Sequence, residues 1–231
     1  MPGVKQQNIG EAIARVRERI ANAATRSGRE STSVRLIAAT KRVTPERVFE
    51  ALDAGVEDIG ENRVQEARAK REAITQPANW HLIGHLQSNK AKTAARLFDA
   101  VHSIDSERIA RELARHRPED AAPIAALIEV DLTGIPGRTG ARPDESQDLL
   151  RRVAALPGVH VLGLMTIAPQ VSPEEARRYF IQLRELRDGL ENTTGWRLPE
   201  LSMGMTDDFE VAIEEGATMV RIGRAIFGER A

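Results

Sequence analysis

Short strand-forming runs alternate with amphipathic helical segments along the whole chain, and this alternation limits the fold more than any other feature. The expected strands cover residues 34–39, 56–60, 80–84, 100–104, 124–132, 159–168, 198–202 and 218–223. Eight strand–helix units are typical of a TIM barrel, whose usual length of about 250 residues is close to the 231 residues here. We therefore predict an α/β fold built as a single (β/α)8 TIM barrel.

An additional amphipathic helix precedes the first expected strand. Residues 8–26 carry apolar side chains at helical spacing with charged residues between them. The last unit has no room for a full helix after residues 224–228, so we expect the extra helix to cover the flank of the barrel left open there. We predict one domain over residues 1–231, with residues 1–30 as an N-terminal helix packed on the barrel. The alternative is a doubly wound open sheet, whose connections would have to part near its centre.

Charge and composition argue against several classes of protein. The 33 basic and 34 acidic residues give a net charge of -1, without a global attraction to nucleic acid or anionic membranes. Two tryptophans, one tyrosine and five phenylalanines provide few stacking platforms for nucleic acid. The absence of cysteine excludes disulfides and thiolate metal sites. Without a signal core or a run of 18 apolar residues, we expect a cytoplasmic protein with neither nucleic-acid nor membrane partners.

Two further patterns are interpreted as structural. His81 and His85 are four residues apart, like a helical metal pair, but Gly84 and the strand pattern of residues 80–83 argue against a helix, so we expect no metal site. The arginine-rich segments 63–71 and 177–187 alternate with glutamate and are interpreted as solvated helix faces.

Lys41 stands at the carboxyl end of the first expected strand, where barrels and open sheets place their ligands. Residues 44–46 (Thr-Pro-Glu) then begin a helix, with a hydroxyl cap and proline at the first helical position. By alternation Lys41 shares a face with Ile37 and Ala39, so its stem would be packed and desolvated. Desolvation disfavours the ammonium form and makes a lysine able to form a Schiff base. The alternative is a lysine that extends from the strand end into solvent.

The loops after the seventh and eighth expected strands are the usual phosphate site of such barrels. Ser202 and Thr206 supply hydroxyl groups there, and Gly223 and Arg224 supply backbone amides before a short helix. Ordinary turn geometry is the alternative for Gly204 or Gly223 taken alone. A Schiff-base lysine that faces a phosphate site indicates a ligand with both an aldehyde and a phosphate. Pyridoxal 5'-phosphate (PLP) and the phosphosugar substrates of lysine aldolases both meet this description.

Several sequence blocks resemble a known family. The C-terminal blocks 201–205 (LSMGM), 208–210 (DFE), 216–218 (GAT) and 220–228 (VRIGRAIFG) are similar to the signature of the YggS/PROSC proteins, which bind PLP. Blocks 60–66 (GENRVQE) and 81–90 (HLIGHLQSNK) resemble two further hallmarks of that family, so that the likeness covers essentially residues 34–228. The resemblance implies a single barrel similar to the N-terminal domain of alanine racemase, PLP held as a lysine aldimine, and a role in vitamin B6 and amino-acid homeostasis.

The resemblance also implies roles for individual residues. Lys41 would be the aldimine lysine, and Arg221 would face the pyridine nitrogen. Ser202, Gly223 and Arg224 would bind the phosphate. The remaining predicted pocket residues lie in the matching blocks: Asn62, His85, Met203 and Thr206.

The sequence departs from the family pattern at two places. Arg42 and Val43 follow the lysine where a Thr-Lys-Pro-like sequence is more usual, so Arg42 could alter the rim of the pocket. Thr206 stands where a serine is common, and because it keeps the hydroxyl we expect phosphate binding to persist.

The expected role is that of a PLP carrier without robust catalytic activity. A permanent cation at Arg221 disfavours protonation of the pyridine nitrogen and weakens the ring as an electron sink. A racemase or other low-turnover PLP enzyme is the alternative, but it needs a second base. The only tyrosine, Tyr179, is expected on the barrel exterior, and His85 is at least as well explained as a wall residue. PLP-dependent apoenzymes would be possible acceptors, and we expect a monomer or weak dimer.

Overall fold

The computed structural model describes residues 7–228 as a closed barrel of parallel strands. Residues 1–6 and 229–231, which are the ends of the domain predicted over 1–231, lie outside the described residues. The strands are β1 (Arg35–Ala39), β2 (Asp58–Glu61), β3 (Asn79–Leu82), β4 (Ala100–Ile104), β5 (Ile124–Glu129), β6 (Val159–Met165), β7 (Glu200–Ser202) and β8 (Met219–Ile222). Each strand pairs with its neighbour in sequence, and β1 pairs with β8.

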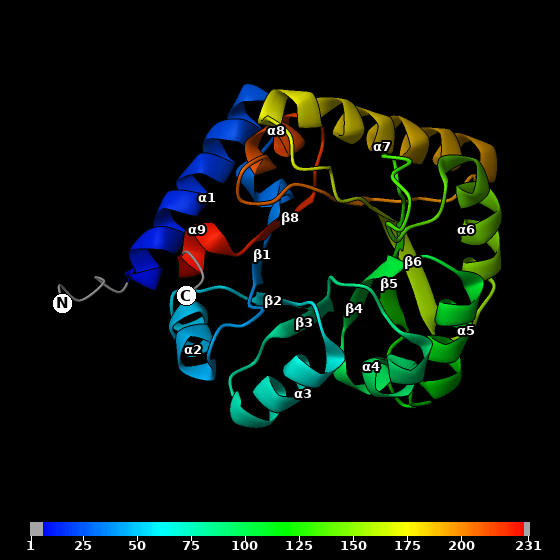
Figure 1. Cartoon of the computed structure of the whole chain (residues 1–231), viewed down its shortest axis with the longest axis horizontal. Coiled ribbons are helices and arrows are strands. Elements are labelled where there is room, and N and C mark those ends of the chain that lie inside the picture. Colours follow the sequence, from blue (N-terminus) through cyan, green and yellow to red (C-terminus); the bar gives the residue numbers. More distant parts are fainter. Residues whose placement is uncertain (1–6, 229–231) are drawn as a thin grey trace.

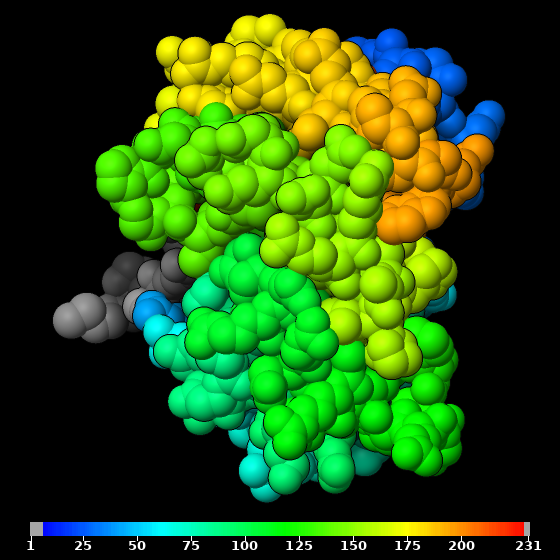
Figure 2. Space-filling model, turned by 90° about the vertical axis from the view of Figure 1, so that its right-hand side faces the viewer, coloured from blue at the N-terminus to red at the C-terminus, as the bar shows by residue number. Residues whose placement is uncertain are grey.

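Helices form a ring around these strands (Figure 1). They are α1 (Ile9–Arg26), α2 (Pro45–Asp53), α3 (Val64–Ala73), α4 (Ala91–Leu97), α5 (Glu107–His116), α6 (Ser146–Ala154), α7 (Pro173–Thr194), α8 (Phe209–Glu214) and α9 (Arg224–Phe227). Short 3-10 turns occur at η1 (Ser31–Ser33), η2 (Ser88–Lys90) and η3 (Pro143–Glu145). Figure 2 shows the ring from the side of α5 and α6, with α7 across the top of the view.

The predicted fold class is confirmed, with differences at the ends of the strands. β5 stops at Glu129 and β6 at Met165, several residues before the predicted ends, because the chain leaves the barrel there to form the loops of the mouth. Val130 still makes an isolated bridge to Ala141 in the following loop. The apolar pattern of a strand therefore continues into loop residues that are buried beside the barrel.

Two helix starts differ in how they are capped, and the hydroxyl cap predicted at Thr44 is not formed. Ser172 and Glu175 form the two hydrogen bonds of a capping box at the start of α7. Thr44 is the N-cap of α2 and Pro45 begins the helix, but the Thr44 side chain makes no capping hydrogen bond. The extended backbone of Thr44 and the proline that follows it therefore define the start of α2 without a hydrogen bond from the hydroxyl.

Helix α1 closes the ring between α8 and α2. It buries one face, which includes Ile9, Ile13, Val16 and Ile20, and packs against α2, α8 and α9. Burial of each such side chain contributes about 1.5–3 kcal/mol. Helix α9 spans only Arg224–Phe227, so α1 supplies most of the cover on this side of the sheet.

The two faces of the barrel strands bury different chemistry. The face toward the helices belongs to one continuous apolar core. The face toward the barrel axis is partly polar: Asp58, His81, His102, Ser202 and Arg221 hydrogen-bond to one another in a chain and are at most 7% exposed. Polar groups at this depth are costly unless they are hydrogen-bonded, so these side chains require partners inside the barrel.

Candidate functional site

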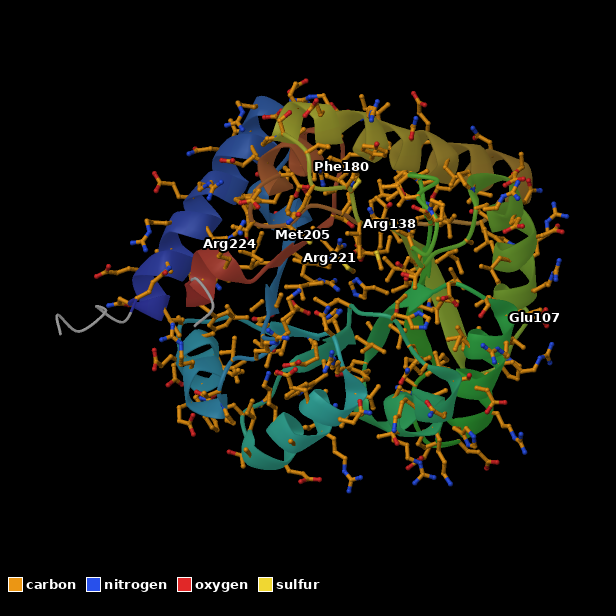
Figure 3. All side chains as sticks on the ribbon, in the orientation of Figure 1. Glu107, Arg138, Phe180, Met205, Arg221 and Arg224 are labelled. Atoms are coloured by element: carbon orange, nitrogen blue, oxygen red, sulfur yellow. The ribbon has the colours of Figure 1, made fainter. Side chains whose placement is uncertain are left out.

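A cavity of about 580 Å³ opens at the carboxyl ends of the strands. Its volume lies within the range of about 300–1,000 Å³ that is usual for small-molecule sites. Several of the predicted site residues line it: Lys41, Asn62, Thr206, Arg221, Gly223 and Arg224. Figure 3 shows Arg221 and Met205 near the middle of the ring, with Arg224 on the side of α9. The structure thus brings the end of β1 and the ends of β7 and β8 to one cavity.

Lys41 lies two residues beyond the end of β1, in a turn, and is half-buried. It lines the cavity together with Ala39 from the same strand. Helix α3 holds the backbone on both sides of it: the Lys70 ammonium donates to the carbonyl of Thr40, and the amide of Arg42 donates to the Glu66 carboxylate. The position of Lys41 is therefore fixed by a neighbouring helix.

The carboxylate of Glu61 completes this anchor. It is fully buried and accepts hydrogen bonds from Lys70 Nζ at 2.6 Å and from Thr40 Oγ1 at 2.5 Å. Lys70 is itself only 5% exposed and also pairs with Glu66 at 2.8 Å. Burial raises the pKa of Glu61, although the hydrogen bonds from Lys70 and Thr40 oppose the change. The interpretation of residues 63–71 as a wholly solvated face is therefore wrong at Lys70.

Arg42 adopts a backbone conformation that is unusual for a residue with a side chain. Its φ is 61°, in the left-handed region, which costs an L-residue roughly 1–2 kcal/mol. The conformation lets the amide of Val43 donate to the carbonyl of Thr40 and closes the turn that carries Lys41. The exposed Arg42 side chain borders a second hollow of about 280 Å³ beside the main cavity, together with Arg47.

The loop after β7 turns sharply at Gly204. Its φ is 92°, and a Cβ there would lie 2.6 Å from the Ala212 Cβ and 2.9 Å from the Phe209 Cα. Glycine is therefore required for the chain to pass this close to α8. The turn carries Thr206 to the start of α9, where its hydroxyl oxygen accepts a hydrogen bond from the amide of Ala225 at 3.4 Å.

Arg221 reaches the cavity from β8 and is 4% exposed. Its Nη1 donates to Ser202 Oγ at 2.6 Å, and its Nη2 donates to the carbonyl of Thr166 at 2.9 Å. Burial lowers the pKa of Arg221 to about 10, opposed by the charges of Asp208 and Glu129. The guanidinium is therefore still a cation at neutral pH.

Three predicted site residues lie away from the lining of the cavity. Ser202 is fully buried behind Arg221, with its oxygen in the hydrogen bond just described. Met203 is fully buried in the apolar core between strands and helices. The His85 side chain is 47% exposed and pairs with Asp105 at 3.3 Å.

The sequence reasoning missed several polar residues of the barrel. Asp58, His81 and His102 connect to Ser202 through the interior. Glu129, at the end of β5, is 4% exposed; its Oε1 accepts from Thr139, while its Oε2 has no hydrogen-bond partner among the described residues. Burial raises the pKa of Glu129. Polar residues among apolar neighbours in these strands were the available signal.

Residues 7–228 contain neither a metal-binding cluster nor a helix able to span a membrane. Among the residues that the structure describes, no cluster of three or more histidine, cysteine, aspartate or glutamate side chains has a geometry that could hold a metal ion. None of the helices in this part of the chain has the length and apolar character needed to cross a bilayer.

Comparisons with known proteins agree on a family. The family model described as the N-terminal domain of alanine racemase matches residues 12–231. The pyridoxal phosphate homeostasis protein of Aquifex aeolicus is 44% identical over 225 residues, which cover 96% of this chain and 99% of that protein. The protein of the same name from Escherichia coli K12 is 39% identical over 229 residues, covering 96% of this chain and 97% of that one.

Solved structures show the same relationship. PipY of Synechococcus elongatus, solved with PLP bound, has a TM-score of 0.85 and 37% identity, and the match covers 95% of this chain and 100% of PipY. Alanine racemase from Corynebacterium glutamicum has a TM-score of 0.68 at 21% identity, over 96% of this chain and 61% of the enzyme, which shows a common fold. The chain therefore belongs to the YggS/PROSC family of pyridoxal phosphate homeostasis proteins.

Proposed function

We propose that this chain binds PLP in the mouth of the barrel, with Lys41 forming a Schiff base to its aldehyde, and takes part in PLP and amino-acid homeostasis. The observation that carries the proposal is that Lys41, Thr206, Gly223 and Arg224 line one cavity. In the covalent step the Lys41 nitrogen would bond to the aldehyde carbon, and the aldehyde oxygen would leave as water. The family membership and the PLP in the PipY structure support the same assignment.

The phosphate is assigned to the side of the cavity formed by the β7 and β8 loops. Thr206 offers a hydroxyl, and Gly223 and Arg224 open α9 beside it. Arg224 also pairs with Asp207, so its side chain is held at the rim. Because the Ser202 hydroxyl is already bonded to Arg221, we assign Ser202 a role through Arg221 in place of direct contact with phosphate.

Arg221 is assigned to the pyridine nitrogen. A cation at this position disfavours protonation of the nitrogen, and PLP then withdraws electrons less strongly from a bound amine. This favours a carrier over an enzyme with robust turnover. Tyr179 also lies on α7, on the outside of the barrel and beside Arg178, where it cannot act as a second base in the mouth.

We further propose a domain assignment, a compartment, an oligomeric state and acceptors for the cofactor. We assign the whole chain to one PLP-binding domain in the cytoplasm, as a monomer or weak dimer. PLP-dependent apoenzymes are the proposed acceptors of the cofactor, and Asn62 is the proposed neighbour of Lys41 on the wall of the cavity.

The absorbance spectrum of the purified protein tests this function. A Schiff base makes the protein yellow, and borohydride reduction followed by peptide mass spectrometry should locate the label on Lys41. The variant Lys41→Ala should lose the absorbance, whereas Lys92→Ala, at an exposed position on α4, should keep it. A colourless protein that also takes up no added PLP would refute the proposal.

A further inference from the structure

A chain of hydrogen-bonded side chains crosses the interior of the barrel and ends at Arg221. Asp58 Oδ1 lies 2.9 Å from His81 Nε2, and His81 Nδ1 lies 2.9 Å from His102 Nε2. His102 Nδ1 in turn lies 2.8 Å from Ser202 Oγ, which accepts the hydrogen bond from Arg221 at 2.6 Å. This hydrogen-bond network thus links β2, β3, β4, β7 and β8.

The side chains of this hydrogen-bond network are among the most deeply buried polar groups of the described structure. His102 and Ser202 are fully buried, His81 is 2% exposed and Asp58 is 7% exposed. A buried polar group without a partner costs about 1–3 kcal/mol. Each of these groups has a partner on both sides, so the chain is a complete network and not a set of isolated polar residues.

The hydrogen atoms of the network can be placed by counting donors and acceptors. Burial by itself would raise the pKa of Asp58, but the hydrogen bonds from His81 and Asn79 and the charge of Arg35 lower it overall, so the carboxylate is an acceptor. His81 must then carry a hydrogen on Nε2. If His81 is neutral, its Nδ1 accepts from His102 Nε2, and His102 Nδ1 accepts from the Ser202 hydroxyl.

The alternative arrangement leaves one hydrogen without an acceptor in the network. A cationic His81 would donate from Nδ1 to His102 Nε2. Burial, with the charges of His81 and Arg221, lowers the pKa of His102 well below its usual value, so His102 would hold its one hydrogen on Nδ1. That hydrogen and the one from Arg221 would both point at the Ser202 oxygen. The hydroxyl hydrogen of Ser202 would then have no acceptor in the network. The neutral arrangement uses every hydrogen once.

We propose that Asp58, His81, His102 and Ser202 act as positioning residues that turn a lone pair of the Ser202 oxygen toward Arg221 and so fix the guanidinium plane in the mouth of the barrel. The proposal rests on the function assigned to Arg221 above. Ser202 from β7 and the carbonyl of Thr166, which follows β6, anchor the two terminal nitrogens of Arg221. These two anchors, together with the bond to the side chain, define the plane of the guanidinium, and the remaining N–H groups are left for a ligand in the cavity.

The direction of the hydrogens gives the network a second effect. Each donor points away from Arg221 and toward the carboxylate of Asp58, so each hydrogen bond polarises the next. The Ser202 oxygen is thereby made a better acceptor for the guanidinium. An apolar interior of the same size would leave the rotation of Arg221 restrained by the Thr166 carbonyl alone.

Nitrogen-15 NMR of the full-length protein without cofactor tests the network directly. At pH 7 both His81 and His102 should be neutral and protonated on Nε2. In Asp58→Asn, where a carbonyl oxygen remains as acceptor, the tautomers should be unchanged. In Asp58→Leu, which has a similar size and no acceptor, both imidazoles should lose the single tautomer, including His102, which does not contact Asp58. A cation at either histidine, a hydrogen on Nδ1, or an unchanged His102 in Asp58→Leu would overturn the proposal.

Titration with PLP tests the positioning of Arg221. Ser202→Ala should weaken the affinity about tenfold, the loss expected for a hydrogen bond to a charged group. Asp58→Leu should weaken it less, and Asp58→Asn, which keeps an acceptor but removes the charge, less again. The control His160→Gln, at an exposed position on β6, should bind as the unaltered protein does. Equal affinity in all variants would overturn the role of the network. If the unaltered protein binds no PLP, the assigned function fails, while the NMR result still decides whether the network turns a lone pair of the Ser202 oxygen toward Arg221.

Discussion

Replacing Lys70 with methionine tests whether the buried charges on α3 hold the Lys41 turn. Lys70 is 5% exposed, and its ammonium contacts the carboxylates of Glu61 and Glu66 and the carbonyl of Thr40. Methionine keeps the length and apolar stem but leaves Glu61, which is fully buried, without its counter-charge. Removal of one partner of a buried ion pair costs about 3–5 kcal/mol. In a protein of this size we expect the melting temperature to fall by roughly 6–20 °C.

The loss of stability in Lys70→Met should depend on pH, and the direction of this dependence follows from the pKa of Glu61. Burial already raises the pKa of Glu61 with Lys70 present, so removal of Lys70 should raise it further. A carboxyl with a higher pKa in the folded than in the unfolded state binds more protons when folded. The free energy of unfolding therefore falls as pH rises from about 4.3 through the folded pKa. Lys70→Met should be impaired most at pH 8 and much less at pH 5.

Urea unfolding, followed by circular dichroism at pH 5 and pH 8, measures both quantities. The double variant Lys70→Met/Glu61→Gln should recover at least about 2 kcal/mol at pH 8, because the buried charge is gone. Arg68→Met removes an exposed ion pair to Glu72 on the same helix and should cost less than about 1 kcal/mol. A loss below about 1 kcal/mol for Lys70→Met, or a loss that is the same at both pH values, would refute the reasoning.

Three other variants test separate features of the mouth. Arg42→Gly should stabilise the protein by about 0.5–1 kcal/mol, because glycine adopts the φ of 61° without strain; thermal unfolding measures the gain, and a loss would contradict it. Gly204→Ala should lower the free energy of unfolding by about 2–4 kcal/mol, because its Cβ would lie 2.6 Å from the Ala212 Cβ. Gly189→Ala, in α7 with open space around it, should raise the free energy of unfolding by about 1 kcal/mol. Similar unfolding midpoints for the two variants would contradict this. Glu129→Gln should stabilise the protein more at pH 8 than at pH 5, since burial raises the pKa of Glu129. Chemical denaturation at both pH values, with the exposed Glu145→Gln as control, decides that case.

The barrel and one rim of the cavity could be predicted because they depend on order along the chain. Eight alternations of strand and helix specify a barrel, and the carboxyl ends of parallel strands meet at one mouth. Lys41, Thr206 and Gly223 lie within four residues of the ends of their strands, so the topology alone places them together. The side chains of these residues need no further information to be assigned to the same cavity.

The interior network and the anchor on α3 could not be predicted in this way. Whether His81 meets His102 depends on the stagger of β3 against β4 and on which face of each strand points inward, and the alternation of residues fixes neither. Lys70 has charged neighbours in sequence and so resembles a residue of a solvated helix face, yet it is buried because α3 lies against the turn after β1. Both features depend on contacts between elements.

The two networks hold the cavity by different physical means, and the difference bears on function. Lys41 is positioned through its backbone by full charges in the layer outside the strands. Among the described residues, Arg221 forms no ion pair with a carboxylate; a hydroxyl and a carbonyl hold it instead. A carboxylate in contact would neutralise most of the field of the guanidinium, whereas neutral acceptors orient it and leave its charge for the ligand. If PLP binds with its pyridine nitrogen beside this cation, as proposed, the charge would disfavour protonation of the ring and weaken it as an electron sink, which favours the proposed carrier role.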